Sequence, residues 1–160
     1  MSWTVIALVT LAFSLTGAPG AAIGAEWTVN TIPTEDKSGT RCVVESKRES
    51  VWDGYQKTTA YLSVAPNSVS LISAVPFDGS ATDFGLAVDD ETFIRMDRLG
   101  GEKVASFDSK ADRLIAQFKA GLRARVKMRF WPTWPATGAH EVTFSLIGFT
   151  RAYTELSGCR

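Results

Sequence analysis

Histidine is almost absent from this chain of 160 residues, in which His140 is the only one. The two cysteines, Cys42 and Cys159, lie far apart in the sequence. Zinc and similar metals are held by clusters of such side chains at short spacings, which this chain lacks. The acidic run at residues 89–91 lacks the alternating ligands and the glycine of a calcium loop. The sequence therefore predicts no metal site and no cofactor.

A motif for catalysis is also missing. His140 begins a predicted strand, and the candidate nucleophiles Ser106 and Ser145 resemble ordinary strand serines. A catalytic histidine needs a nucleophile and an orienting acid beside it, and no pattern here supplies them. Gly100-Gly101 precedes a strand and not a helix, so it is no phosphate loop. No pair of carboxylates stands out for glycoside hydrolysis. We therefore expect that the protein is not an enzyme.

Net charge is absent too, because 17 Lys and Arg residues balance 17 Asp and Glu residues. Proteins that bind nucleic acid usually carry an excess of positive charge, so we expect no nucleic-acid partner. The charges are unevenly placed, however. Residues 78–97 carry six acids and one base, whereas residues 110–129 carry seven bases and one acid.

The chain has one long apolar run, at residues 3–15, and a stretch of small residues follows it up to Ala25. This pattern predicts a secretory signal peptide at residues 1–25, cleaved after Ala25 or, as an alternative, after Ala22. An uncleaved membrane anchor is the other interpretation, which the shortness of the run disfavours.

Residues 26–160 are then expected to form a single β-rich domain in the periplasm or outside the cell, with no transmembrane segment after cleavage. In an exported protein an even number of cysteines indicates a disulfide, so we expect Cys42 to be bonded to Cys159. Two unpaired thiols remain the alternative.

The stretch from Ser109 to Leu156 predicts helix, strand, strand and helix in that order. Ser109 is placed to cap the first helix, and Gly121 is placed to end it. From Arg123 the apolar residues alternate with charged ones, which is typical of a half-buried strand. A second alternating strand begins at His140, and Gly148 allows the turn into the last helix.

The earlier part of the chain reads as short strands separated by turns. Residues 84–88 and 92–96 flank an acidic turn and predict a β-hairpin. Together these patterns predict a mainly β fold. We expect an antiparallel β-sandwich or curled sheet of about eight strands, with two helices in the C-terminal half.

Two surface features are candidates for partner binding. The first is the basic stripe, defined as Arg123, Arg125, Lys127 and Arg129, which can meet an acidic protein, glycan or lipid head group. Alternatively, it is a solvated strand face that acids on neighbouring strands neutralise. The second is a proline-stiffened loop with Trp131 and Trp134, which either grips a partner or covers an end of the core.

Several segments resemble the invasion-associated locus B family of bacterial envelope proteins. They are the signal sequence, Trp27-Thr-Val, Arg41–Glu49, Phe84–Asp90, Met96–Phe107, Leu114–Gly121 and Val142–Leu156. The most specific motif is Ser145-Leu-Ile-Gly-Phe-Thr-Arg-Ala152, a strand, a glycine turn and a terminal helix. The chain departs from the family where a further cysteine pair is expected, because it has Met96 and Gly100-Gly101 there.

The resemblance implies an exported β-sandwich without catalysis that acts as a binding or accessory module, with a protein or glycan partner in the cell envelope. In some bacteria the family is linked to host-cell entry. The sequence is also similar to small periplasmic accessory proteins of type VI secretion. A small exported hydrolase or ligand carrier with a site that the sequence hides is the alternative from another class.

Overall fold

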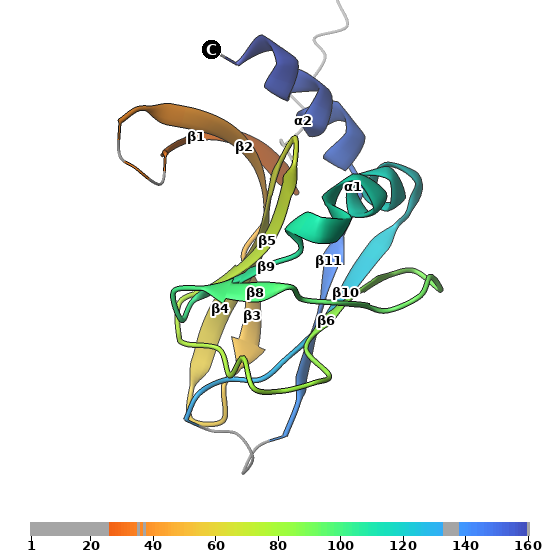
Figure 1. The fold of residues 1–160 in the computed structure, drawn as a ribbon. Coiled ribbons are helices and arrows are strands. Elements are labelled where there is room, and N and C mark those ends of the chain that lie inside the picture. Colours follow the sequence, from red (N-terminus) through yellow and green to blue (C-terminus); the bar gives the residue numbers. More distant parts are fainter. Residues whose placement is uncertain (1–25, 35, 37, 133–137, 160) are drawn as a thin grey trace, which may run out of the picture.

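The computed structural model describes residues 26–34, 36, 38–132 and 138–159, which form two antiparallel sheets and two α-helices. The sheets enclose one hydrophobic core, and both helices lie at the same end of it (Figure 1). The expected mainly β sandwich or curled sheet with two late helices is therefore confirmed. The predicted signal peptide, residues 1–25, lies outside the described residues.

The larger sheet has seven strands, in the order β1-β2-β4-β5-β9-β8, with β3 paired to β4 beside β2. The strands are β1 (Trp27–Pro33), β2 (Thr40–Ser46), β3 (Glu49–Trp52), β4 (Lys57–Ala65), β5 (Ser68–Ser73), β8 (Arg98–Gly100) and β9 (Val104–Ser106). Strand β4 pairs with β2 along one half and with β3 along the other. Where β2 ends, the Ser46 hydroxyl accepts a 2.9 Å hydrogen bond from the Leu62 amide and so continues the ladder.

The smaller sheet has four strands, in the order β11-β10-β6-β7. They are β6 (Gly85–Val88), β7 (Ile94–Arg95), β10 (Arg123–Met128) and β11 (His140–Ser145). The predicted hairpin is confirmed by the pairing of β6 with β7. Alternation along β10 also follows the prediction, because Ala124, Val126 and Met128 are fully buried while Arg123 and Arg125 are exposed.

Both predicted helices are present, as α1 (Ala111–Ala120) and α2 (Phe149–Glu155). Short 3-10 turns precede α1 (η1, Asp108–Lys110) and follow α2 (η2, Leu156–Gly158). Helix α1 ends at Gly121, where a Cβ atom would lie 2.5 Å from Val88. Gly148 precedes α2 with a φ of 88°, a conformation that favours glycine. None of the helices in the described ranges is long and apolar enough to cross a bilayer.

The expectation that Ser109 caps the first helix is wrong. Ser109 lies within the η1 turn, and the N-cap of α1 is Lys110, which makes no side-chain capping bond. Ser109 instead donates from its amide, at 2.7 Å, and from its hydroxyl to the carboxylate of Asp97, just before β8. The polar side chain therefore ties the start of the helical segment to the edge of the larger sheet.

An aromatic cluster joins the first strand to both helices. The ring of Trp27 lies 4.9 Å from that of Phe149 in α2 and 6.3 Å from that of Phe118 in α1. The indole of Trp27 donates a 2.8 Å hydrogen bond to the carbonyl of Ser145, so the polar edge of this buried ring is satisfied. The cluster fixes the position of β1 relative to the end of the chain.

Two strands of the structure were missed in the sequence. Strand β3 is only half buried and lacks an apolar run, and β8 contains Gly100, which indicated a turn. The β8–β9 hairpin turns at Gly101, which has a φ of 58°. Each strand is short and pairs with a single neighbour, the next strand along the chain, so an apolar pattern of its own is lacking.

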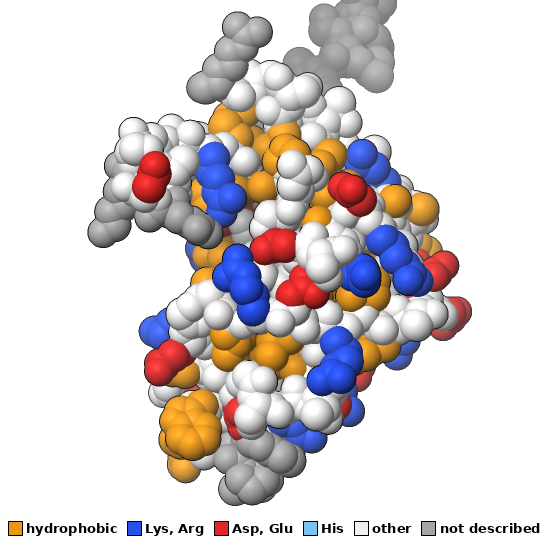
Figure 2. All heavy atoms as spheres, viewed as in Figure 1, with side chains coloured by type: hydrophobic (Ala, Val, Ile, Leu, Met, Phe, Trp, Pro, Cys, Tyr) orange, Lys and Arg blue, Asp and Glu red, His pale blue; other side chains and the backbone are white. Residues whose placement is uncertain are grey.

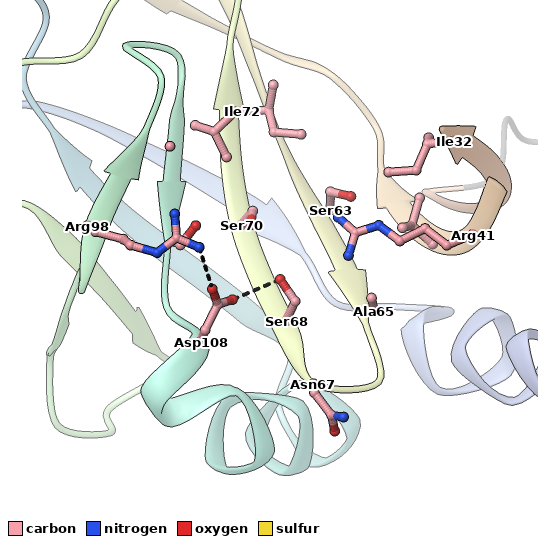
Figure 3. Close-up of a pocket in the computed structure, with 14 residues that line it drawn as sticks. Ile32, Arg41, Ser63, Ala65, Asn67, Ser68, Ser70, Ile72, Arg98 and Asp108 are labelled. Atoms are coloured by element: carbon pink, nitrogen blue, oxygen red, sulfur yellow. Dashed lines mark hydrogen bonds and ion pairs between the residues drawn. The ribbon is translucent and has the colours of Figure 1, made fainter. Parts of the chain in front are cut away.

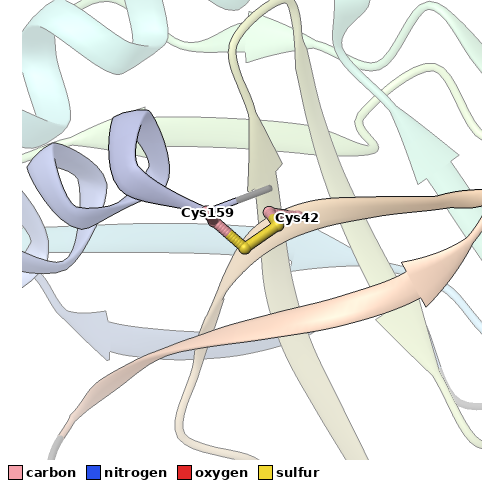
Figure 4. Close-up of a disulfide and its surroundings, with 2 residues drawn as sticks. All are labelled: Cys42 and Cys159. Atoms are coloured by element: carbon pink, nitrogen blue, oxygen red, sulfur yellow. A yellow bond between two sulfur atoms is a disulfide. The ribbon is translucent and has the colours of Figure 1, made fainter.

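The expected disulfide is confirmed, because Cys42 of β2 is bonded to Cys159, which follows η2 (Figure 4). The two Cα atoms lie 6.2 Å apart, and 117 residues separate the cysteines in the sequence. Closing a loop of this length restricts the unfolded chain strongly. The bridge therefore holds the C-terminal helix against the second strand.

Reduction of this bridge is expected to destabilise the domain, by about 4 kcal/mol in the chain-entropy model. For a domain of this size that corresponds to a fall in melting temperature of roughly 10 °C or more. The measurement is thermal unfolding with and without a reductant, with the double variant Cys42→Ser, Cys159→Ser as the matched control. Equal melting temperatures for the oxidised and the reduced protein would contradict the expectation.

Candidate functional site

One face of the larger sheet packs on the core, and the other is open and concave, because β1 and β2 curl outward from the body of the molecule (Figure 1). A hollow of about 630 Å³ lies on this open face. In the space-filling view the molecule is indented beside the β1–β2 ribbon, with Lys or Arg side chains around the indentation (Figure 2). We call this hollow the open-face groove.

Three serines form one row across the floor of the open-face groove. In the strand register Ser63 of β4 lies opposite Ser70 of β5, and Ser70 lies opposite Ser106 of β9. Only 8% of Ser63 and 4% of Ser106 is exposed, yet their hydroxyls have no hydrogen-bond partner among the described residues. Neither hydroxyl oxygen is itself fully buried, so both are reached from the groove. These groups are therefore free to bind a ligand in the groove.

Two arginines reach over this floor from opposite sides, Arg41 from β2 and Arg98 from β8 (Figure 3). Arg98 lies opposite Ser106 in the register, and its guanidinium lies 3.4 Å from the carboxylate of Asp108. Both partners of this ion pair are exposed, so the pair stabilises little. Arg41 makes no ion pair within the described part of the chain. The groove thus holds two guanidinium groups and one carboxylate.

Two further contacts define the ends of the site. Ser68 donates a 2.8 Å hydrogen bond to Asp108 and so fixes this carboxylate beside Arg98. At the other end Glu45 lies opposite Ser63 in the register, and its carboxylate accepts a 2.7 Å hydrogen bond from Asn30. The serine row therefore runs from a basic end at β8 to an acidic end at β2.

The basic stripe, by contrast, is paired with an acidic side chain at its C-terminal end. Arg129 donates two hydrogen bonds of 2.8 and 2.9 Å to the carboxylate of Asp83, and Lys127 lies 3.1 Å from the same group. The hydrogen bond from Arg129 lowers the pKa of Asp83 to about 2. The side chain of Arg129 is only 14% exposed, so a partner would reach it poorly.

At the N-terminal end of the basic stripe the chain is hydrogen-bonded to Asp89, in the turn between β6 and β7. Its carboxylate accepts from the amides of Leu122 and Arg123, at 2.9 and 3.0 Å, and its carbonyl accepts from the guanidinium of Arg125. Asp89 adopts a φ of 46°, which is unusual for a residue with a side chain, and these bonds hold it there. The acidic segment thus faces the basic segment, and Asp83 neutralises part of the stripe through its ion pairs with Lys127 and Arg129. Partner binding by the stripe stays a prediction.

The tryptophan loop lies partly outside the described residues. Trp131 is 59% exposed and its amide donates to the carbonyl of Pro76 at 3.1 Å, whereas Trp134 lies outside the described residues. Of the two interpretations of this loop, covering an end of the core does not hold for Trp131. The adjacent Phe130 fills that place, being 1% exposed and stacked on Phe77.

The candidate catalytic residues do not come together. His140 begins β11 and packs its ring 5.6 Å from that of Phe130, and burial lowers its pKa. Ser145 lies at the opposite end of the same strand, where its hydroxyl accepts from the amide of Ile147. Ser106 lies on the floor of the open-face groove, in the other sheet. Neither serine is placed as a nucleophile for His140.

No family model matches this sequence, and no curated protein matches it. Among solved structures, the fold is similar to the crystal structure of invasion associated protein B from Bartonella henselae, with a TM-score of 0.51 and 19% sequence identity. The similarity covers 83% of this chain and 92% of that chain. At this identity the likeness concerns the fold, and at that level the resemblance indicated by the sequence motifs is confirmed.

Replacing Asp83 with Asn is expected to lower stability by about 1–2 kcal/mol at neutral pH, because Arg129 loses its charged acceptor in a mostly buried place. The native pKa of Asp83, about 2, lies below the usual value, so its stabilisation is present above about pH 5 and is lost as the pH falls toward 2. The test is urea unfolding of wild type and variant from pH 7 to pH 2, with the exposed Asp90→Asn as control. A difference that does not shrink in acid would contradict the assignment.

Replacing Trp131 with Ala is expected to change the free energy of unfolding by no more than about 0.5 kcal/mol, because most of the side chain is exposed. Trp27→Ala is the matched control, since Trp27 is 4% exposed and its loss should cost about 3–5 kcal/mol. Chemical denaturation measures both. A cost for Trp131→Ala close to that of the control would restore the packing interpretation.

Proposed function

We propose that this protein is a non-enzymatic binding module of the bacterial cell envelope, working in the periplasm or outside the cell. The signal pattern at residues 1–25 supports export. The bond between Cys42 and Cys159 supports an oxidising compartment, since such bonds rarely persist in the cytosol. The fold, similar to that of invasion associated protein B, supports an accessory role of the locus B type.

The observation that carries the binding role is the open-face groove. Its floor holds two mostly buried hydroxyls without a hydrogen-bond partner among the described residues, and arginines stand on both sides of it. Hydroxyls and guanidinium groups gathered in one hollow can form hydrogen bonds with a single partner. We infer that the open-face groove is where a partner is recognised.

A ligand carrier is the alternative that the same groove favours, since a hollow of about 630 Å³ lies within the range of small-molecule sites. An exported hydrolase is less well supported, because Ser106 and His140 lie in different sheets. The basic stripe, Arg123, Arg125, Lys127 and Arg129, together with Trp131 and Trp134, remains a second candidate surface for a partner.

Export is tested by producing the full chain in a bacterial host and separating periplasm from cytoplasm. We expect the protein in the periplasmic fraction, with a mature N-terminus at Glu26 by mass spectrometry and no reactive thiol after denaturation. A chain without residues 1–25 is the control and should stay in the cytoplasm with both thiols reactive. A mature protein that begins at Met1 or Ser2 would rule out the signal peptide.

A further inference from the structure

We propose that the open-face groove binds an acidic saccharide, a short chain of sugar rings that carry carboxylates. This inference rests on the proposed binding role and names the ligand class for it. The ligand would lie across the strands, with its sugar hydroxyls on the serine row and its carboxylates toward the two arginines.

The charge of the ligand follows from Arg41 and Arg98. A guanidinium stays protonated at any physiological pH and forms paired hydrogen bonds with a carboxylate. The two side chains point into the same hollow from opposite strands, so one anionic ligand can meet both (Figure 3). The exposed pair with Asp108, at 3.4 Å, is weak enough for Arg98 to exchange its partner.

The saccharide nature of the ligand follows from the spacing of the floor. Ser63, Ser70 and Ser106 stand on three adjacent strands, and adjacent strands lie about 4.8 Å apart. This repeat is close to the length of one pyranose ring in a chain of sugars. Each hydroxyl can donate one hydrogen bond and accept others, which suits the mixed donors and acceptors of sugar hydroxyls.

An extended peptide fits the same floor less well. Side chains on one face of an extended peptide repeat about every 6.6 Å, which does not match the serine row. Strands β4, β5 and β9 are paired on both sides, so their backbone amides are not available for strand addition. Recognition on this floor must therefore use side chains, and these are short hydroxyls.

The walls of the open-face groove and the ends of the serine row predict how the ligand is oriented. Ile32, Ile72 and Val104 line the hollow and offer apolar contact to the C–H faces of sugar rings. Glu45 closes the β2 end of the serine row with a negative charge that repels a carboxylate. Along the serine row an acidic group is therefore expected at the Arg98 end, and neutral hydroxyls toward Glu45.

Trigalacturonic acid is a suitable probe, with maltotriose as the uncharged match and a hexapeptide of glutamates as the peptide match. Binding to the purified, oxidised domain is measured by calorimetry and by amide chemical shifts. We expect trigalacturonate to bind at least about ten-fold more tightly than maltotriose, because two charge-assisted contacts are lost in the neutral sugar. Its affinity should fall as salt rises. The shifted amides should lie in β4, β5, β8 and β9.

Variants of the groove make the test specific. Arg41→Gln and Arg98→Gln should each weaken trigalacturonate binding about ten-fold, whereas Arg151→Gln, on the exposed side of α2, should leave it unchanged. Asp108→Asn should strengthen binding, because it releases Arg98 and removes a negative charge from the groove.

The serines provide an independent readout. Ser63→Ala and Ser106→Ala should weaken binding by about 3- to 10-fold each, through the loss of one hydrogen bond. Both variants should melt close to the temperature of the wild type, because neither hydroxyl has a hydrogen-bond partner among the described residues. A purely structural role for these serines would lower the melting temperature and leave binding unchanged.

Three results would overturn the proposal. The first is no binding of trigalacturonate at millimolar concentration, and the second is tighter binding of the glutamate peptide. The third is binding that Arg123→Glu and Arg125→Glu remove while Arg41→Gln and Arg98→Gln do not. Export of the full chain is measured separately, so a failure of the saccharide assay leaves the proposed location standing, and a cytoplasmic protein would refute that location alone.

Discussion

The packing of Trp27 against Phe149 and Phe118 is the contact on which the shape of the molecule depends. It seats the first strand on the two helices, and the indole bond to the Ser145 carbonyl fixes its direction. The disulfide adds a second attachment one strand further, at Cys42. Between them these attachments hold the β1–β2 ribbon in its outward curl, and the curl makes the open face of the larger sheet concave.

Local pattern was enough to predict most of the fold. Strand β10 and helix α1 were readable because each buries its apolar residues at a regular period, and Gly148 marks the turn before α2. The predicted N-cap role of Ser109 was wrong because its hydroxyl donates to Asp97, which is distant in sequence. Strands β3 and β8 were not predicted for another reason, because both are short and neither has an apolar pattern of its own beside its hairpin partner, β4 or β9.

The candidate site was not predictable from the sequence. The basic stripe was a candidate because its charges recur at every second residue of one strand. Asp83 and Asp89, which flank β6, nevertheless contact that strand. The groove residues Ser63, Ser70 and Ser106 are unremarkable in any local window. They become a row only through the register of three strands, and that register is set by long-range pairing. Their one local signal is small size on strands whose other face is mostly apolar.

The partners of Trp27 also determine the order in which the domain can fold. Strand β1 leaves the ribosome first, but the helix that receives its indole ring, and the cysteine that secures its neighbour, are made last. Such distant contacts make folding slow, and an incomplete chain has nothing to seat its first strand on. An incomplete chain therefore lacks the contacts that hold its first strand, and the compact form is reached only when both ends of the domain have been made.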